Sequence, residues 1–134
     1  MSIQEKKTVK ATYYKEAMRY ISNAKDILKK TSVEYNVSYK DQKYSRSASG
    51  IAYLGVLKAL DGYLLLKGIK LPQKEKNIDN YRKLLSEIDK KVLVFLNNAY
   101  STLQIMGYYH GTTSKKLLQA GFEDAQFIIN KIKP

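Results

Sequence analysis

The chain lacks cysteine and tryptophan and contains only two prolines and one histidine in 134 residues. Without cysteine it can form neither a disulfide nor a thiolate metal site. One histidine cannot supply the paired Glu-x-x-His motifs of a di-iron bundle, and His110 has no glutamate three residues before it. The sequence therefore predicts no metal site and no cofactor.

Motifs of enzymatic chemistry are equally scarce. A Ser-His-Asp arrangement would depend on His110, which stands beside Gly111 where a helix is expected to end and imidazole commonly caps carbonyls or faces solvent. There is no Gly-x-x-x-x-Gly-Lys-Ser/Thr phosphate loop, and Gly50, Gly55 and Gly62 fall inside an expected helix, where small size serves packing. We therefore expect no catalytic residues and no enzymatic activity.

No apolar run is long enough to cross a bilayer. Residues 51–66, IAYLGVLKALDGYLLL, form the longest one, but Lys58 and Asp61 interrupt it and it falls short of the roughly 20 residues required. The first ten residues, MSIQEKKTVK, are polar where a secretory signal needs an apolar core. We expect no membrane insertion and a cytoplasmic location.

Positive charge is the strongest compositional bias. Lys and Arg number 24 against 12 Asp and Glu, which gives a formal net charge of +12. Such a surplus attracts phosphates, acidic proteins or anionic lipid surfaces. Because the basic residues are spread along the chain in short groups, two interpretations stay open: a basic but unspecialised surface, or a functional anion-binding face.

The first half of the chain carries apolar residues at helical spacings of three and four. They predict an amphipathic helix over residues 13–30 and a second helix from an N-cap at Asp41 to Gly68. A polar connector over residues 31–40 joins them. No segment alternates with period two, and so few glycines and prolines leave little room for hairpin turns.

The second half predicts one short helix and the start of a long one. The short helix covers residues 78–88 and opens at Asn77 or Asp79. Ser86 and Asp89, three residues apart, have the pattern of a capping box. The next long helix is therefore expected to start there.

That long helix should stop at residues 109–111, after which Thr112 or Thr113 caps a last helix whose apolar stripe ends at Ile132. Four long helices and one short one, joined by short loops, predict an all-α, up-and-down antiparallel four-helix bundle with an additional short helix. One domain covers residues 1–134, with an ordered core at about residues 11–132 and frayed ends.

The central helix is apolar nearly all round, so it must be enclosed by other helices. Its small residues recur at spacings of four and three and let a neighbouring backbone approach: Ala48, Ala52, Gly55, Ala59 and Gly62. Lys58 and Asp61 are three apart on one face and could pair with each other. They line either a solvated strip or a pocket, and only a pocket would make them functional.

Tyrosine is unusually abundant, with 12 residues against three phenylalanines. Tyr39 and Tyr44 interleave with Lys43 and Arg46, and aromatic rings beside cations suit the bases and phosphates of a single-stranded nucleic acid. The same residues would serve a loop that packs over a helix end. The candidate ligand or partner contacts are Tyr39, Lys43, Tyr44, Arg46, Lys58, Asp61, Tyr100, Tyr108, Tyr109 and His110.

Four segments together form a family-like pattern: AYLGVLKAL in the central helix, Asp89-Lys90-Lys91, Ala99-Tyr100, and Gly107-Tyr108-Tyr109-His110-Gly111. Over about residues 11–132 this pattern resembles the HEPN-like helical bundles. It is most similar to a small stand-alone bacterial group related in fold to the substrate-binding subunits of nucleotidyltransferases. The resemblance implies a bundle, often dimeric, that binds a nucleotide, a nucleic acid or a protein partner.

Ribonuclease members of that superfamily carry an arginine followed, after four to six residues, by a histidine on one helix. In this chain the positions that would hold the arginine before His110 are Leu103, Gln104 and Ile105. None of these side chains carries the permanent positive charge that would stabilise a phosphorane. What the resemblance implies here is therefore a non-catalytic bundle.

Three functions remain as predictions. The first is a non-catalytic interaction module that forms a homodimer or pairs with a protein partner. The second is binding of nucleotide or RNA through the basic, tyrosine-bearing segment at residues 35–46 and the lysines of the first helix. The third is a HEPN-type ribonuclease that would act through His110.

Overall fold

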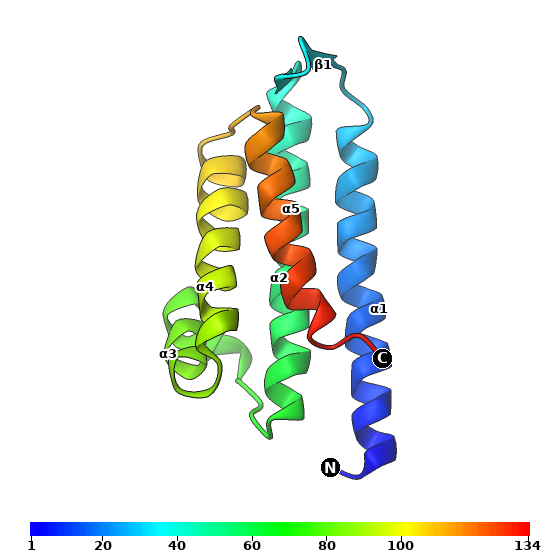
Figure 1. The fold of residues 1–134 in the computed structure, drawn as a ribbon, viewed down its shortest axis with the longest axis vertical. Helices are drawn as coiled ribbons and strands as arrows, with labels where there is room; N and C mark the ends of the chain where they lie inside the picture. The colour runs from blue at the N-terminus through cyan, green and yellow to red at the C-terminus, as the bar shows by residue number, and fades with distance from the viewer.

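Helices α1 (Ile3–Leu28) and α2 (Gln42–Leu66) run antiparallel and form the most extensive helix pair of the computed structural model, which describes residues 1–134 (Figure 1). Glycines of the small-residue stripe let the two backbones approach. A Cβ on Gly62 would lie 2.7 Å from the Cβ of Tyr13, and one on Gly55 would lie 3.1 Å from the carbonyl oxygen of Ala17. At these positions the stripe is covered by α1 of the same chain.

The other helices complete an antiparallel bundle. After a 3₁₀ turn, η1 (Gln73–Glu75), the short helix α3 (Ile78–Ile88) packs on α4 (Lys90–Ala99). The last helix, α5 (Lys115–Asn130), contacts α1, α2 and α4, and in Figure 1 it crosses in front of α2. The predicted all-α bundle with one additional short helix is confirmed.

Between α1 and α2 the predicted polar connector contains a small β-hairpin, which corrects the expectation that hairpin turns have no room. Strands β1 (Val33–Glu34) and β2 (Ser38–Tyr39) pair antiparallel, and Tyr35 and Asn36 turn the chain with φ angles of 52° and 57°. Asparagine tolerates this left-handed conformation at position 36, and Tyr35 adopts it as well, so the turn forms without a glycine. Two-residue strands are too short to show alternation.

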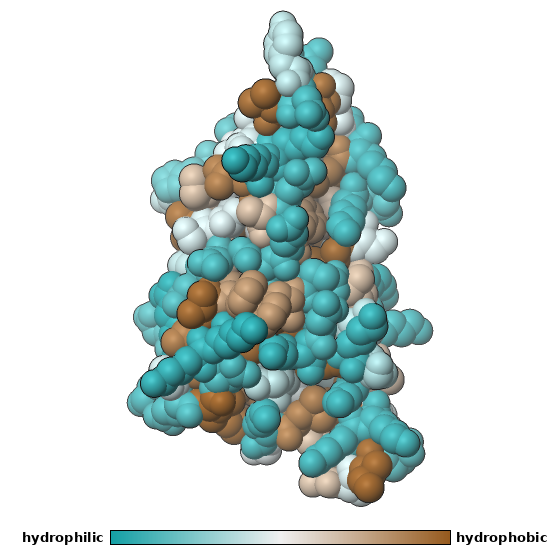
Figure 2. Space-filling view, viewed as in Figure 1, coloured by the Kyte–Doolittle hydropathy of each residue, from teal (hydrophilic) through white to brown (hydrophobic).

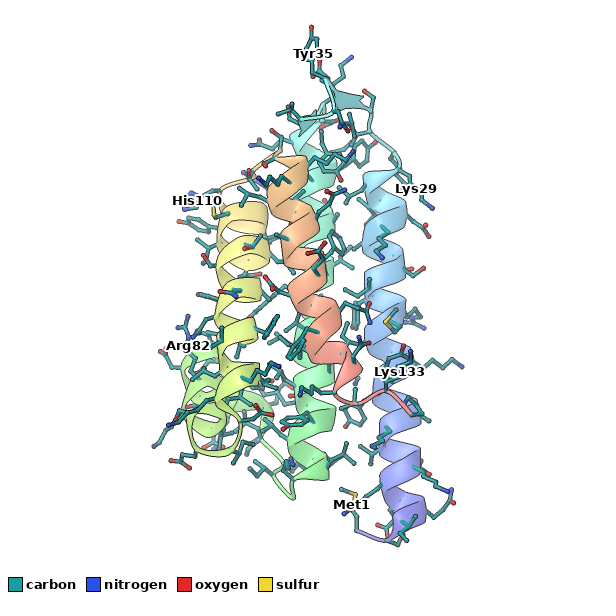
Figure 3. All side chains as sticks on the ribbon, in the orientation of Figure 1. Met1, Lys29, Tyr35, Arg82, His110 and Lys133 are labelled. Atoms are coloured by element: carbon teal, nitrogen blue, oxygen red, sulfur yellow. The ribbon has the colours of Figure 1, made fainter.

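The hairpin is held by the segment that leads into α5. The backbone N–H of Tyr39 donates to the carbonyl of Thr113 at 2.9 Å, and that of Lys115 donates to the carbonyl of Val37 at 3.0 Å. Figure 3 shows Tyr35 at the tip of the hairpin, pointing away from the bundle. The hairpin therefore closes one end of the bundle, and the turn after α2 with α3 forms the other.

Several predicted helix ends are confirmed. The side chain of Asp41 accepts a hydrogen bond from the amide of Lys43 at 2.9 Å and caps α2, and that of Asn77 accepts one from Asn80 and caps α3. Gly68 follows α2 with a φ of 82°, the left-handed conformation expected beyond a helix C-terminus.

Three other predicted ends are wrong. Ser86 donates to the carbonyl of Lys83, and it is Asp89 that caps α4 by accepting from the Val92 amide at 3.1 Å. The last helix is capped by Ser114, one residue after the predicted threonines Thr112 and Thr113. Helix α1 begins ten residues before position 13, because Ser2 and Glu5 form a capping box.

The helix that starts at Lys90 changes character at Tyr100. Its second half, η2 (Tyr100–Tyr109), is a π-helix, in which the amide of His110 donates to the carbonyl of Ile105, five residues back, at 2.8 Å. Its buried residues follow α4's Ala99 at steps of four, namely Leu103 and Gly107. A side chain at Gly107 would collide with Ser49 of α2, so this glycine lets η2 lie close to α2.

By length and composition α2 could cross a membrane, which corrects the expectation that no apolar segment is long enough: the helix has 25 residues and its most apolar 18-residue window has a mean hydropathy of 1.3. Half of that window is buried inside the bundle, as in a core helix. Ala48, Ala52 and Ala59 are fully buried, and the helix is enclosed by its neighbours along much of its surface. Polar side chains cover most of the face shown in Figure 2, with apolar residues in separate small groups.

Candidate functional site

Some of the predicted contact residues converge where the first turns of α2 meet the end of η2. The side-chain amide of Gln42 donates to the carbonyl of Gly111 at 2.8 Å, and Arg46 lies beside the same glycine, whose φ is 70°. One helical turn further along α2, the ring of Tyr108 lies over Gly50, where an added Cβ would stand 2.7 Å from the ring. The two helices therefore present a joint surface.

This joint surface contains a hollow of about 420 Å³, which we name the α2–η2 groove; its lining residues are Ser47, Gly50, Ile51, Leu54, Gln104 and Tyr108. Two apolar side chains face solvent there, with Leu54 48% and Tyr108 49% exposed. Residues on the inner side of the same two helices are buried, such as Tyr53 at 7% and Leu103 at 0% exposed. The groove is thus an apolar strip that no other element of the chain covers.

Two predicted cations border the groove at its hairpin end, and we name them the basic rim: Lys43 and Arg46. They line a second hollow of about 480 Å³ together with Asp41, Gln42 and Ser47, and Ser47 belongs to both hollows. Neither cation takes part in an ion pair. Lys43 instead stands over the ring of Tyr44, with Nζ 4.8 Å from the ring centre.

The basic surface continues around the hairpin end. Beyond the basic rim lies a hollow of about 420 Å³. Its lining residues are Lys30, Thr31, Ser32, Lys40, Asp41, Gln42 and Tyr44. We name it the hairpin-end hollow. Tyr44 lies here, on the side of α2 that faces the hairpin, and not in the α2–η2 groove.

Tyr39, Tyr109 and His110 lie apart from the groove lining. Tyr39 lines a different hollow, between α1 and α5, with Leu28 and Phe122, and burial raises the pKa of its hydroxyl. Tyr109 is 70% exposed, and the exposed His110 ring meets it edge-on at 5.0 Å. Figure 3 places His110 on the outer edge of η2, so the imidazole faces solvent.

Asp61 is the centre of a polar cluster near the other end of α2, and its predicted pairing with Lys58 is wrong. One carboxylate oxygen accepts from Lys76 Nζ at 2.9 Å and the other from the Tyr81 hydroxyl at 2.7 Å. Lys58 instead stands over the ring of Tyr13, 4.8 Å from its centre. The chain turns back after α2 and brings Lys76 and Tyr81, which follow Asp61 by 15 and 20 positions, within hydrogen-bond distance of its carboxylate.

Of the two surroundings predicted for Asp61, the structure has the pocket. A small cavity of about 130 Å³ is lined by Asp61, Lys76, Tyr13 and aliphatic side chains of the turn that follows α2. Burial, followed by the hydrogen bond to Asp61, raises the pKa of Tyr81. Both carboxylate oxygens of Asp61 are already bonded within the chain, so this cluster holds the turn against the bundle.

A second carboxylate–tyrosine bond lies at the same end. The hydroxyl of Tyr63 donates to Asp89 at 2.6 Å, while the other carboxylate oxygen caps α4. Burial, with the bond to Asp89, raises the pKa of Tyr63 to about 12. Partial burial would raise the pKa of Asp89, but the hydrogen bonds from Tyr63 and Val92 outweigh it and hold that pKa below its usual range.

Tyr100 is also a packing residue. Its ring lies 5.8 Å from that of Tyr53, and the Arg82 guanidinium stands 5.0 Å from its centre. Arg82 in turn donates from Nε to the side-chain oxygen of Asn97 at 2.7 Å. Among the predicted contacts, Lys58, Asp61 and Tyr100 therefore make contacts within the bundle, whereas the basic rim and Tyr108 line hollows at the surface.

The sequence did not single out Ile51, Leu54 or Gln104 as contact residues. All belong to apolar or weakly polar helical segments, where only the neighbouring helices decide which positions stay uncovered. A signal does exist in hindsight: Leu54 lies off the stripe of small residues that faces α1. No group of three or more His, Asp or Glu side chains is placed to hold a metal ion.

Comparison with known proteins gives a family and a fold. A solved structure, a protein of unknown function from Dyadobacter fermentans, is 33% identical to this chain, with a TM-score of 0.77; the match covers 98% of this chain and 96% of that one. Comparison with curated proteins finds no match. Residues 12–134 match the family described as a domain of unknown function, DUF5618, and the chain therefore belongs to the DUF5618 family.

Proposed function

We propose that this chain is a non-catalytic interaction module that binds a protein partner through the α2–η2 groove. The observation that carries the proposal is the apolar strip around Leu54 and Tyr108, which faces solvent beside the unpaired cations of the basic rim. An apolar surface rimmed by polar residues is typical of protein-binding sites. Aromatic and arginine side chains are also the residues most enriched at such contacts.

The relation to HEPN-like bundles belongs to this proposal. The antiparallel helices fit that resemblance, and no arginine stands on η2 before His110. The small-residue stripe of α2 does not support self-association at Gly55 and Gly62, because α1 of the same chain already packs against these two glycines. A partner of either kind, a second copy or another protein, would have to use the α2–η2 groove instead.

The proposal is tested by photocrosslinking in living cells. A benzophenone amino acid replaces Leu54 in one variant and Val94 in the control, since Val94 is a similarly exposed apolar residue, 55% against 48%, on the outer side of α4. We expect a covalent protein adduct from position 54 and none from position 94. Absence of an adduct at position 54, or equal adducts at both positions, would contradict the proposal.

A second candidate function is binding of nucleotide or RNA, and the hairpin-end hollow favours it. Lys30, Lys40 and Tyr44 surround this hollow, so two cations and an aromatic ring share one concave surface. Binding of fluorescent mixed-sequence RNA should then weaken steeply between 50 and 200 mM salt, because phosphate contacts release counterions. Lys40→Gln should lower that salt dependence, whereas Lys7→Gln on the exposed start of α1 should not.

A further inference from the structure

We propose that the α2–η2 groove receives an acidic amphipathic helix of a protein partner. This inference rests on the proposed function and names the chemistry of the segment that binds. Three features carry it: the shape of the groove, the distribution of charge around it, and the poor fit of a second copy of this chain.

The shape of the groove fits a helix of about two to three turns. On α2, Ser47, Gly50, Ile51 and Leu54 stand at positions i, i+3, i+4 and i+7, which span about 10 Å at 1.5 Å per residue. The opposite wall is formed by Tyr108 and Gln104 of η2. The hollow between the α2 wall and the η2 wall leaves room for apolar side chains at the matching spacing of a third helix.

An extended peptide would fit this groove less well. Both walls are helices, whose backbone groups are bonded within their own turns and offer no strand edge. A segment that enters an apolar strip must satisfy its own backbone N–H and C=O groups, and a helix does so internally. The occupant is therefore helical.

The charge around the groove requires acidic residues on that helix. Asp61 is the one acidic residue of α2, and both of its oxygens are bonded to Lys76 and Tyr81. Residues 90–116, which include η2, contain no acidic residue. The only carboxylate beside the basic rim, that of Asp41, caps α2. Arg46 and Lys43 thus form no ion pair within the chain. Carboxylates at one end of the incoming helix would supply the missing negative charges.

A second copy of this chain fits the same surface poorly. With two grooves face to face, the carboxylate nearest the basic rim of each copy would be that of Asp41, which already caps α2 and lines the same hollow as the cations of its own rim. Each copy also brings a net charge of +12. Like charges placed together cost free energy, so the charge distribution selects a different, acidic partner.

The test uses the full ¹⁵N-labelled chain and three synthetic peptides of 18 residues. The first is an amphipathic helix with leucine at every third or fourth position and glutamate on its flanks. The second has the same composition in scrambled order, and the third replaces each glutamate with lysine. We expect binding of the first alone, with the largest amide shifts at Gly50, Ile51, Leu54 and Gln104.

Two variants locate the contacts. Leu54→Glu should weaken binding of the acidic helix at least about tenfold, whereas Val94→Glu, an equally drastic change on the exposed side of α4, should leave it unchanged. Arg46→Glu should weaken the acidic helix and strengthen the lysine peptide, because the charge pair is reversed. All three residues are exposed, so circular dichroism should show intact helices.

The outcomes separate this inference from the proposed function. Equal binding of the acidic and scrambled peptides, or amide shifts outside the groove, would contradict the proposal that the groove receives an acidic helix. So would a dimer in sedimentation equilibrium that Leu54→Glu dissociates, since the occupant would then be a second copy. In either case an adduct from position 54 in cells would still support the interaction module, and its absence would remove both.

Discussion

The two ends of the bundle use the same residue types in opposite ways. At the α3 end, Asp61 and Asp89 each accept a hydrogen bond from a tyrosine hydroxyl, and Lys76 completes an ion pair. At the hairpin end, Lys43 and Arg46 have no acidic partner and lie beside an open apolar groove. Charge and tyrosine stabilise the fold at one end and are available for binding at the other.

Chain geometry accounts for the difference. After α2 the chain returns through η1 and α3, and this return brings Lys76 and Tyr81 back onto Asp61. At the hairpin end, β2 and the adjacent Val37 bond instead to the backbone that leads into α5. No element folds back over the outer side of α2 there, so Leu54 stays uncovered.

The largest expected effect is the loss of Asp61. Asp61→Ala leaves the half-buried Lys76 without a counter-charge and the Tyr81 hydroxyl without an acceptor, so we expect the free energy of unfolding to fall by about 2–3 kcal/mol. The matched change at the other end, Arg46→Ala, should alter it by less than about 0.5 kcal/mol. Urea unfolding followed by circular dichroism measures both. Equal costs would remove the contrast between the two ends.

A smaller effect is expected at Asp89. Asp89→Ala removes the N-cap of α4 and the acceptor of Tyr63, and should lower the free energy of unfolding by about 1–2 kcal/mol. Asp79 serves as the control, because its carboxylate is 88% exposed and makes only a surface ion pair with Arg82. Asp79→Ala should cost no more than about 0.5 kcal/mol in the same unfolding experiment. If Asp79→Ala lowered the free energy of unfolding as much as Asp89→Ala, the loss would come from removing a negative charge near a helix N-terminus and not from losing the cap.

The smallest effect sharpens the comparison through pH. The pKa of Tyr63 is raised in the folded state to about 12 from its ordinary value of 10.0, so its stabilising contribution is complete below pH 10 and is lost as the pH rises through 12. Tyr63→Phe should therefore flatten the decline of stability between pH 10 and 12. Tyr35→Phe, at the 94% exposed tip of the hairpin, should leave the decline unchanged. Urea midpoints across this range measure the slope; identical slopes for both variants would refute the assignment.

The features predicted correctly from the sequence depend on local chemistry. Asp41, Asn77 and Gly68 mark helix ends because each acts on backbone groups a few residues away. The hairpin and the π-helix were missed because they depend on distant contacts. The hairpin pairs with Ser114, and η2 lies close to α2 where Gly107 meets Ser49 and the Tyr108 ring covers Gly50.

The candidate site shows the same limit. Helical spacing placed Lys43 and Arg46 near the start of α2, but it could not show that Tyr108 lies over the same helix, 58 positions after Gly50. Helical spacing also indicated that Lys58 could pair with Asp61, whereas Asp61 is bonded to Lys76, which lies in the segment after α2 that folds back onto the helix. The sequence places Leu54 off the small-residue stripe, but its exposure depends on which neighbouring helix is absent, and helical spacing does not give that.

Helix α1 is one uninterrupted element with two different surroundings. Its residues Ala17, Ile21 and Ala24 are buried against the bundle, whereas residues 1–8 are all exposed and, in Figure 1, lie beyond the end of α5. Isolated helical turns open readily in water, and packed ones open only with the domain. Deuterium uptake along α1 should therefore rise from slow at Ala24 to fast at Glu5. The position in this one helix at which exchange slows would mark where its amides become protected by packing in the bundle.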